Sequence, residues 1–415
     1  MKRNRVVITG MGTVNAIAKN PDEYAGALEN GVCGIGPITI FDTSAHRTKT
    51  GGEVRDFYPH EMIPSSFTLK RMSRSDLLAM AAAVQALEQA GLFPFPESLC
   101  DTTGISIGGG AGGMFEGETF FESYVKKGRE GTRFSPLSSL FCASSGDHIA
   151  SGLGLFGPKT TFMTACSSGA TAVGFAADQI KSGRADIMIA GGTEPLSRII
   201  YGAFNSLRSV DPEYCKPFDK DRQGLSLGEG AGIFILESLA HSSARGARIL
   251  GEVLGYGVTC DSHHMTSPDP EASGSIRAME AALLDAGVAK EQIEYINAHG
   301  TATPTNDAAE TRGIKTLFEK RAYDIPVSST KSMIAHTLGA AGALEGIACI
   351  LAIINGFIPP TIHLSKPDPE CDLDYVPGRS RRKQLSIVLS NSFAFGGNNT
   401  SVIYGRYTEK GIVHE

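Results

Sequence analysis

The sequence TACSSG at residues 164–169 decides the expected fold and the expected chemistry. The preceding residues 160–164 are rich in β-branched and aromatic side chains, as in a buried strand. Across residues 170–180, small and apolar side chains recur at helical spacing. We therefore predict a tight strand-to-helix turn that places Cys166 at a helix N-terminus, where free backbone N–H groups favour an anion.

Cys166 is a candidate nucleophile, because this setting lowers the pKa of a thiol, which is about 8.5 when free. The alternative is that Cys166 is a small buried apolar residue, as most free cysteines are. The eight cysteines show no paired spacing, so we expect reduced thiols and neither a disulfide framework nor a zinc site.

Length and charge limit the classes of function. The 415 residues are enough for two or three average domains or one large duplicated one. The net charge of -6 gives no global reason to expect binding to nucleic acid or to an anionic membrane. We expect no apolar run to reach the about 18 residues of a membrane span, and residues 1–5 lead straight into a strand-like segment. We therefore expect a cytoplasmic protein.

The second half of the chain repeats the pattern of the first. Strand-like runs open both halves, at residues 5–12 and 248–257. Cys166 and His336 are each followed by a helix of small residues, and a gapless alignment of these two segments pairs Gly169 with Gly339. We infer an α/β protein with two related βαβ-rich halves, residues 1–250 and 251–415, whose loops meet at one site.

Two histidines, His299 and His336, stand at the ends of predicted strands in glycine-rich surroundings. With Cys166 they make a sensible acyl-transfer set, because the cysteine holds the acyl group while the imidazoles act on a second substrate. Taken singly, each histidine also fits a hydrogen-bonded structural role.

Three charged residues lie in apolar, small-residue segments: Asp307, Lys331 and Glu345. We expect them to be paired, because an unpaired buried charge is costly. The alternative is that Asp307 merely begins a helix and that Glu345 lies on a solvated face.

Two glycine-rich loops follow predicted strands. In the loop at residues 393–399, we expect the Phe395 N–H to pair with that of Cys166 as an oxyanion hole, although Phe395 also fits a core aromatic at a turn. The loop GGGAGGM at residues 108–114 lacks both a P-loop lysine and a dinucleotide fingerprint, so we expect no nucleotide there. Two basic clusters are either solvated faces or a docking patch for an acidic partner, namely Lys70, Arg71 and Arg74, and Lys126, Lys127, Arg129 and Arg133.

Four motifs, in this order and at these separations, resemble those of the β-ketoacyl-acyl carrier protein synthases, closest to the type II branch: TACSSG, NAHGTATPTND, STKSMIAHTLGAAGALE and NSFAFGGNN. The resemblance covers residues 4–405. It implies a thiolase-like fold, layered α-β-α-β-α, in a homodimer. It also implies a decarboxylative Claisen condensation that elongates an acyl chain by two carbons from malonyl-acyl carrier protein, with no redox cofactor, nucleotide or catalytic metal.

The resemblance carries roles over by motif position. It implies that Cys166 takes the acyl chain as a thioester, while His299 and His336 bind the malonyl thioester and promote loss of CO2. The remaining implied roles are ordering of the histidines by Lys331 and Glu345; gating by Phe395; substrate contacts by Thr301, Thr303, Ala111, Phe393 and Gly396; carrier-protein docking by Lys70, Arg71, Arg74, Lys126 and Lys127; and, in some members, a structural Na+ or K+ at Asn297, Glu345, Ser390 and Asn391.

The chain departs from the family pattern at three positions. Ala394 and Asn398 replace residues of the usual glycine loop, and a β-carbon at 394 restricts φ and puts the gating by Phe395 in doubt. Ala111 stands where relatives carry a larger residue, which predicts a roomier acyl pocket. Two alternatives to fatty acid elongation stay open: a ketosynthase of a specialised polyketide or polyene pathway, and a non-catalytic partner subunit that sets chain length.

Overall fold

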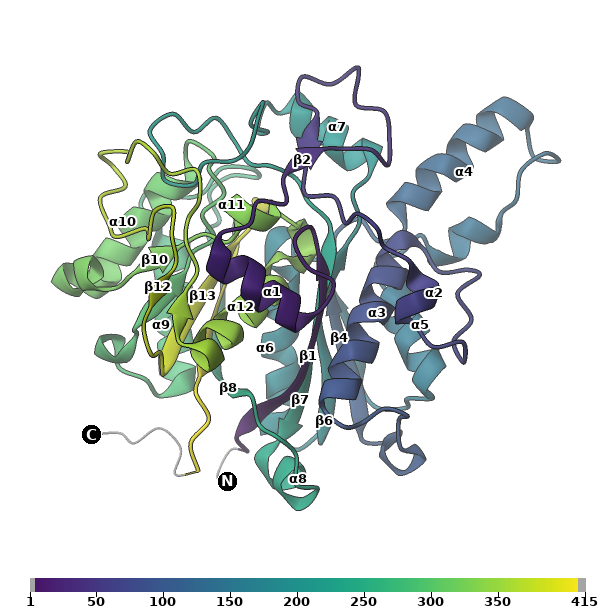
Figure 1. Cartoon of the computed structure of the whole chain (residues 1–415), viewed down its shortest axis with the longest axis horizontal. Helices are drawn as coiled ribbons and strands as arrows, with labels where there is room; N and C mark the ends of the chain where they lie inside the picture. Colours follow the sequence, from purple (N-terminus) through teal and green to yellow (C-terminus); the bar gives the residue numbers. More distant parts are fainter. Residues whose placement is uncertain (1–3, 410–415) are drawn as a thin grey trace.

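A computed structural model describes residues 4–409, and its centre is a ten-stranded mixed sheet (Figure 1). The order of strands across the sheet is β10-β9-β13-β14-β8-β1-β7-β6-β4-β5. The strands are β1 (Val6–Asn15), β4 (Thr103–Gly108), β5 (Lys159–Phe162), β6 (Ile187–Glu194), β7 (Gly230–Ser238), β8 (Gly251–Cys260), β9 (Tyr295–Asn297), β10 (Val327–Ser328), β13 (Ile387–Phe393) and β14 (Asn398–Gly405).

The sheet repeats one arrangement twice. In each half, counting its five strands along the chain, the order from the outer edge inward is third, second, fourth, fifth, first. The last strand of each half is antiparallel to its neighbours, and β1 and β8 meet antiparallel at the centre. The predicted duplication is therefore confirmed, and the boundary expected at residue 250 falls directly before β8.

Helices form three layers around the sheet. The two middle helices, α6 (Ser168–Lys181) and α12 (Ala341–Asn355), pack against each other and against both halves of the sheet. Their small side chains allow this close approach; a Cβ at Gly342, for example, would lie 2.7 Å from the Ala170 backbone nitrogen. The outer layers are α3 (Arg74–Gln89) on β1 and β7, and α9 (Ser273–Ala286) and α10 (Asn306–Phe318) on the other half.

The other helices and short strands complete the fold: α1 (Pro21–Asn30), α2 (Pro59–Met62), α4 (Met114–Lys127), α5 (Ser144–Leu153), α7 (Arg198–Ser206), α8 (Leu239–Ala244), α11 (Lys331–Ile334), β2 (Gly36–Pro37) with β3 (Thr50–Gly51), and β11 (Phe357–Ile358) with β12 (Arg381–Arg382). In Figure 1, α4 stands out from the body of the molecule, on the side of α3 and α5.

Three expectations about local structure need correction. The strand before Cys166 is not buried, because β5 is the edge strand of the sheet and its side chains are half-buried or exposed. The helix expected after Lys331 is broken into α11 and α12, with His336 between them. One apolar run, Leu338–Asn355, does reach 18 residues, but 89% of it is buried, so it is a core helix here. Residues 1–3, which were expected to lead straight into the first strand, lie outside the described residues.

Candidate active site

Cys166 lies where the chain turns from β5 into α6, in the 3-10 turn η3 (Ala165–Ser167). Ala165 has a φ of 51°, in the left-handed region that non-glycine residues rarely adopt. The backbone therefore bends sharply just before the thiol. The Cys166 side chain is 6% exposed and lies at the start of α6, as predicted.

The predicted lowering of the Cys166 pKa is wrong. Burial raises the pKa of the thiol to about 12, and the charge of Lys331 and a hydrogen bond from the Phe395 N–H to the sulfur oppose the rise only in part. Desolvation therefore outweighs the helix N-terminus, and the resting thiol is protonated at neutral pH.

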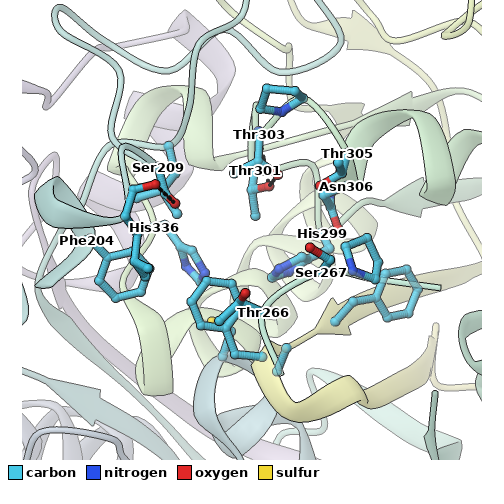
Figure 2. A pocket seen from close by; sticks show the side chains of 18 of the residues that line it. Phe204, Ser209, Thr266, Ser267, His299, Thr301, Thr303, Thr305, Asn306 and His336 are labelled. Atoms are coloured by element: carbon cyan, nitrogen blue, oxygen red, sulfur yellow. Dashed lines mark hydrogen bonds between the residues drawn. The ribbon is translucent and has the colours of Figure 1, made fainter. Parts of the chain in front are cut away.

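His299 and His336 meet in one cavity with Cys166. The two imidazole rings are perpendicular, with centroids 5.3 Å apart, and face each other across the middle of the cavity (Figure 2). The cavity has a volume of about 330 Å³ and is lined by side chains from both halves of the chain. Loops from both halves therefore meet at one site, as the duplication predicted.

Both histidines are neutral hydrogen-bond donors in this setting. Burial, followed by the charge of Lys331, lowers the pKa of each imidazole well below its usual value. The Leu338 N–H donates to Nδ1 of His336 at 3.2 Å, which leaves the proton of the neutral ring on Nε2.

The segment that carries His299 is held by Glu310, a residue that the sequence reasoning missed. The Glu310 carboxylate on α10 accepts the N–H groups of His299 and Gly300, each at 2.8 Å, and the side-chain amide of Asn391 at 3.2 Å. Burial raises the pKa of Glu310 to about 7. Its signal in the sequence is the one that singled out Glu345: a charge among small residues.

Lys331 and Glu345 form a buried ion pair, and each side chain is 1% exposed. The solvated face considered for Glu345 is therefore wrong. Burial raises the pKa of Glu345 to about 7 although Lys331 lowers it. Lys331 also places a positive charge near both histidines, which favours their neutral forms.

Thr301 and Thr303 line the cavity, and their hydroxyl oxygens are 2.9 Å apart (Figure 2). Between them, Ala302 has a φ of 66°, and its N–H donates to Asp307 at 3.1 Å. Asp307 also accepts the Phe218 N–H at 2.8 Å, so it is bonded and buried rather than only the start of a helix.

Arg222, on a loop of the first half, is a second residue that the sequence reasoning missed. Its guanidinium donates to the carbonyls of Thr303 and Pro304, at 3.3 and 2.9 Å, and pairs with Asp368. This loop of the first half therefore fixes the threonine segment of the second.

The Phe395 loop contributes Phe393, Ala394 and Phe395 to the cavity. The ring of Phe395 stacks on Phe204, with centroids 5.6 Å apart. Ala394 has extended backbone angles (φ -131°, ψ 158°), so its β-carbon causes no strain in this conformation. Gly396, expected at the substrate, is exposed and does not line the cavity.

Ala111 lies outside this cavity. It lines a second, mostly apolar cavity of about 700 Å³ beside α4, together with Phe121, Phe141 and Met163, among others. The larger space is consistent with the small side chain at position 111.

The basic residues expected at the carrier-protein surface separate into two groups. Lys70, Arg71, Lys126 and Lys127 are exposed. Arg74 is not free to bind a carrier protein, because its guanidinium forms a two-point ion pair with the buried Glu229. This internal contact argues against docking by Arg74.

The residues expected to hold a cation include three with buried oxygens that lack a hydrogen-bond partner: Asn297 Oδ1, Glu345 Oε2 and Ser390 Oγ. Asn297 and Ser390 are direct partners on the neighbouring strands β9 and β13. Asn391 differs, because its side chain already bonds Glu310 and Ser401. Within residues 4–409, no group of three His, Cys, Asp or Glu residues is placed to hold a metal ion.

Comparison with known proteins links this geometry to one family. Family models described as "Beta-ketoacyl synthase, N-terminal domain" and "Beta-ketoacyl synthase, C-terminal domain" match residues 3–242 and 250–365. The chain is 43% identical to a "3-oxoacyl-[acyl-carrier-protein] synthase 2" of Synechocystis sp., over 98% of this chain and 99% of the relative.

Two solved structures share the fold over 98% of this chain and the whole of theirs. A structure titled "The ishigamide ketosynthase/chain length factor" has a TM-score of 0.93 and 40% identity. A structure of a type II polyketide synthase acyl-carrier protein "in complex with its ketosynthase" has a TM-score of 0.87 and 29% identity.

Proposed function

The chain belongs to the β-ketoacyl synthase family, and from this premise we propose how its buried residues divide one reaction between them. It is a 3-oxoacyl-acyl carrier protein synthase, a condensing acyltransferase that elongates a fatty acyl chain by two carbons. The observation that carries the roles proposed below is that Cys166, His299 and His336 line one cavity.

In the first step, Cys166 takes the acyl chain from acyl carrier protein. Its sulfur bonds to the thioester carbonyl carbon, the bond to the carrier's pantetheine sulfur breaks, and the thiol proton goes to the departing sulfur. The N–H groups of Cys166 and Phe395 stabilise the oxyanion, and the hydrogen bond from the Phe395 N–H to the sulfur supports this role.

In the second step, a malonyl thioester replaces the first carrier. The bond to its carboxyl carbon breaks, CO2 leaves, and the electron pair forms an enolate whose oxygen accepts hydrogen bonds from His299 and His336. The carbanion then attacks the acyl carbon on Cys166, and the released thiolate takes up a proton. Neutral donors suit this charge, because they stabilise the enolate more strongly than the ground-state carbonyl.

Intact-mass analysis with a panel of acyl-acyl carrier proteins tests the first step. Wild type is expected to gain the mass of one acyl group, and Cys166→Ala none. Cys142→Ala is the matched control, since this second thiol lies near the acyl cavity and burial raises its pKa to about 11. No acylation by any donor would overturn the proposal and favour the non-catalytic partner subunit.

We propose docking of acyl carrier protein on Lys70, Arg71, Lys126 and Lys127. These side chains are exposed, and a carrier protein that is acidic would meet a basic surface. Arg71→Glu is expected to raise KM for the acyl carrier protein with little change in kcat. An unchanged KM at low salt would contradict docking at this position.

We propose a homodimer formed through the edge of β5. This strand ends the sheet, and next to it Phe141 and Met163 are 74% and 70% exposed and line the acyl cavity. An open strand edge beside exposed apolar side chains favours association, and a second copy would cover the cavity. Light scattering is expected to give a dimer for wild type and for the control Leu284→Glu, and a monomer for Met163→Glu; a monomeric wild type would contradict the proposal.

A second candidate function is the same condensation in a specialised polyketide or polyene pathway. This candidate is supported by the solved structure titled "The ishigamide ketosynthase/chain length factor", which is 40% identical to this chain. Turnover of saturated and of polyunsaturated acyl donors separates the two candidates. A heterodimer isolated from the native source would likewise support the specialised pathway. The cytoplasmic location stays a prediction, and cell fractionation tests it.

We also propose a structural Na+ or K+ at Asn297, Glu345 and Ser390. Their unpaired buried oxygens are the hard ligands that such ions prefer. A bound cation would supply a positive charge that holds Glu345 and, through it, Lys331. Exchange of Na+ and K+ for a large organic cation is expected to lower the melting temperature, and no change would contradict the site.

A further inference from the structure

Glu194 ends β6 deep inside the molecule and takes no part in the two steps above. Its side chain is fully buried, and its carboxylate accepts three backbone N–H groups. Ala111 donates to Oε1 at 2.5 Å, while Gly110 and Gly339 donate to Oε2 at 2.9 and 2.8 Å. The donors come from the loop that walls the acyl cavity and from the segment that joins His336 to α12.

We propose that Glu194 is a positioning residue that couples the wall of the acyl cavity to His336, so that the chain bound in one cavity adjusts the hydrogen-bond donor in the other. The inference rests on the proposed function, because it requires Cys166 to carry an acyl chain and His336 to act on the malonyl group.

A short path leads from Glu194 to the imidazole. Gly339 follows Leu338, and the Leu338 N–H is the group that donates to Nδ1 of His336. A displacement of Gly339 therefore changes the direction of that N–H, and with it the orientation of the ring and of its Nε2–H. Leu338 has a φ of 46°, a conformation that persists only while its surroundings hold it.

The contact between Gly339 and Glu194 is close-packed and leaves no space for a displacement. A Cβ at Gly339 would lie 2.6 Å from the Glu194 carboxylate and 2.7 Å from the Cα of Gly109. A Cβ at Gly169, three residues after Cys166, would lie 2.9 Å from the Gly339 carbonyl oxygen. The backbones of the two halves thus touch directly at this point, and close-packed groups transmit a shift rather than absorb it.

A double-mutant cycle tests the coupling. Ala111→Ile alters the wall of the acyl cavity, and Glu194→Gln keeps the size of the side chain but replaces one acceptor by a donor. The readouts are CO2 release from malonyl-acyl carrier protein and acylation of Cys166 by intact mass. We expect Ala111→Ile to change CO2 release about fivefold in wild type and less than about twofold in Glu194→Gln.

Glu237→Gln is the matched control. Glu237 is also a fully buried carboxylate, but it lies beside the start of β6, opposite the end that carries Glu194, and its carboxylate binds Arg245 and Thr9 instead of the two loops. In this background, the effect of Ala111→Ile is expected to stay about fivefold. Equal effects in all three backgrounds would overturn the coupling, whereas absence of any acylation would overturn the proposed function instead.

Hydrogen exchange on wild type keeps the proposal testable if Glu194→Gln does not fold. Loading Cys166 with a long instead of a short acyl chain is expected to change the exchange of the Leu338 and Gly339 amides together with those of Gly110 and Ala111. A change confined to Gly110 and Ala111 would overturn the coupling.

Discussion

Cys166 and His336 both lie shortly before a middle helix, two residues before α6 in the first half and five residues before α12 in the second. Each follows an alanine in the left-handed region, with φ of 51° at Ala165 and 64° at Ala335. Each precedes a middle helix, α6 or α12. The segments that lead into the two middle helices therefore present a nucleophile in one half and a hydrogen-bond donor in the other, although Cys166 lies within its 3-10 turn and His336 lies before the 3-10 turn η6 (Leu338–Ala340).

The two turns differ in the groups that surround them. The buried ion pair of Lys331 and Glu345 belongs to the second half, whereas the Cys166 sulfur receives a hydrogen bond from the Phe395 N–H. Burial raises the pKa of Cys166 and lowers that of His336, so both side chains rest in their neutral forms. The two middle helices supply the placement, and a few side chains supply the chemistry.

Replacement of the nucleophile is expected to have the largest effect. Cys166→Ala should lower condensation at least about a thousandfold, because no thioester forms. CO2 release from malonyl-acyl carrier protein should persist, because both histidines remain. Gas release and product analysis measure the two outcomes. A parallel loss of both would show that the two turns do not act separately.

The reciprocal change is His336→Ala. Loss of one donor to the enolate should lower CO2 release about 100- to 10,000-fold and leave acylation of Cys166 within about threefold of wild type. Single-turnover acylation, followed by mass, provides the comparison. Acylation that falls as far as CO2 release would instead indicate that His336 also serves the nucleophile.

The ion pair distinguishes the two turns in stability as well. Lys331→Met leaves a buried carboxylate without its partner, so the free energy of unfolding should fall by about 3 to 5 kcal/mol. Addition of Glu345→Leu should recover most of this loss without restoring CO2 release. Urea denaturation measures the stability of both variants. Full stability in Lys331→Met would mean that another group neutralises Glu345.

The smallest expected effect concerns the acyl cavity, which only the first half carries. Ala111→Ile should lower turnover of long acyl donors about tenfold relative to that of short donors, because the larger side chain fills the cavity wall. Steady-state rates across a series of chain lengths measure this profile. An unchanged profile would remove Ala111 from the determinants of chain length.

Local patterns were enough to predict the duplicated fold and the turn at Cys166. The small residues of α6 and α12 and the strand-like runs before them depend on neighbours in the sequence. The edge position of β5 was not predictable in this way, because it depends on the order of strands across the whole sheet. An isolated pattern of β-branched residues does not distinguish an edge strand from a central one.

Burial is the quantity that the sequence did not supply. The pKa of Cys166 rises because helices and loops from both halves cover the thiol, and Arg74 is withdrawn from the surface by Glu229, which lies far along the chain. Glu194 and Glu310 escaped notice because the sequence does not show which backbone groups face their carboxylates. Their importance appears only when backbone N–H groups from distant loops converge on them.

The packing of α6 against α12 also has a consequence for synthesis on the ribosome. The apolar run Leu338–Asn355 lies near the end of the chain, so the inner face of α6 is uncovered throughout the translation of more than a hundred residues. Neither half buries its middle helix without the other. The first half therefore emerges with an apolar face exposed to water. Emergence of α12 is therefore the event that covers this face, and chaperones are expected to hold the nascent first half until then.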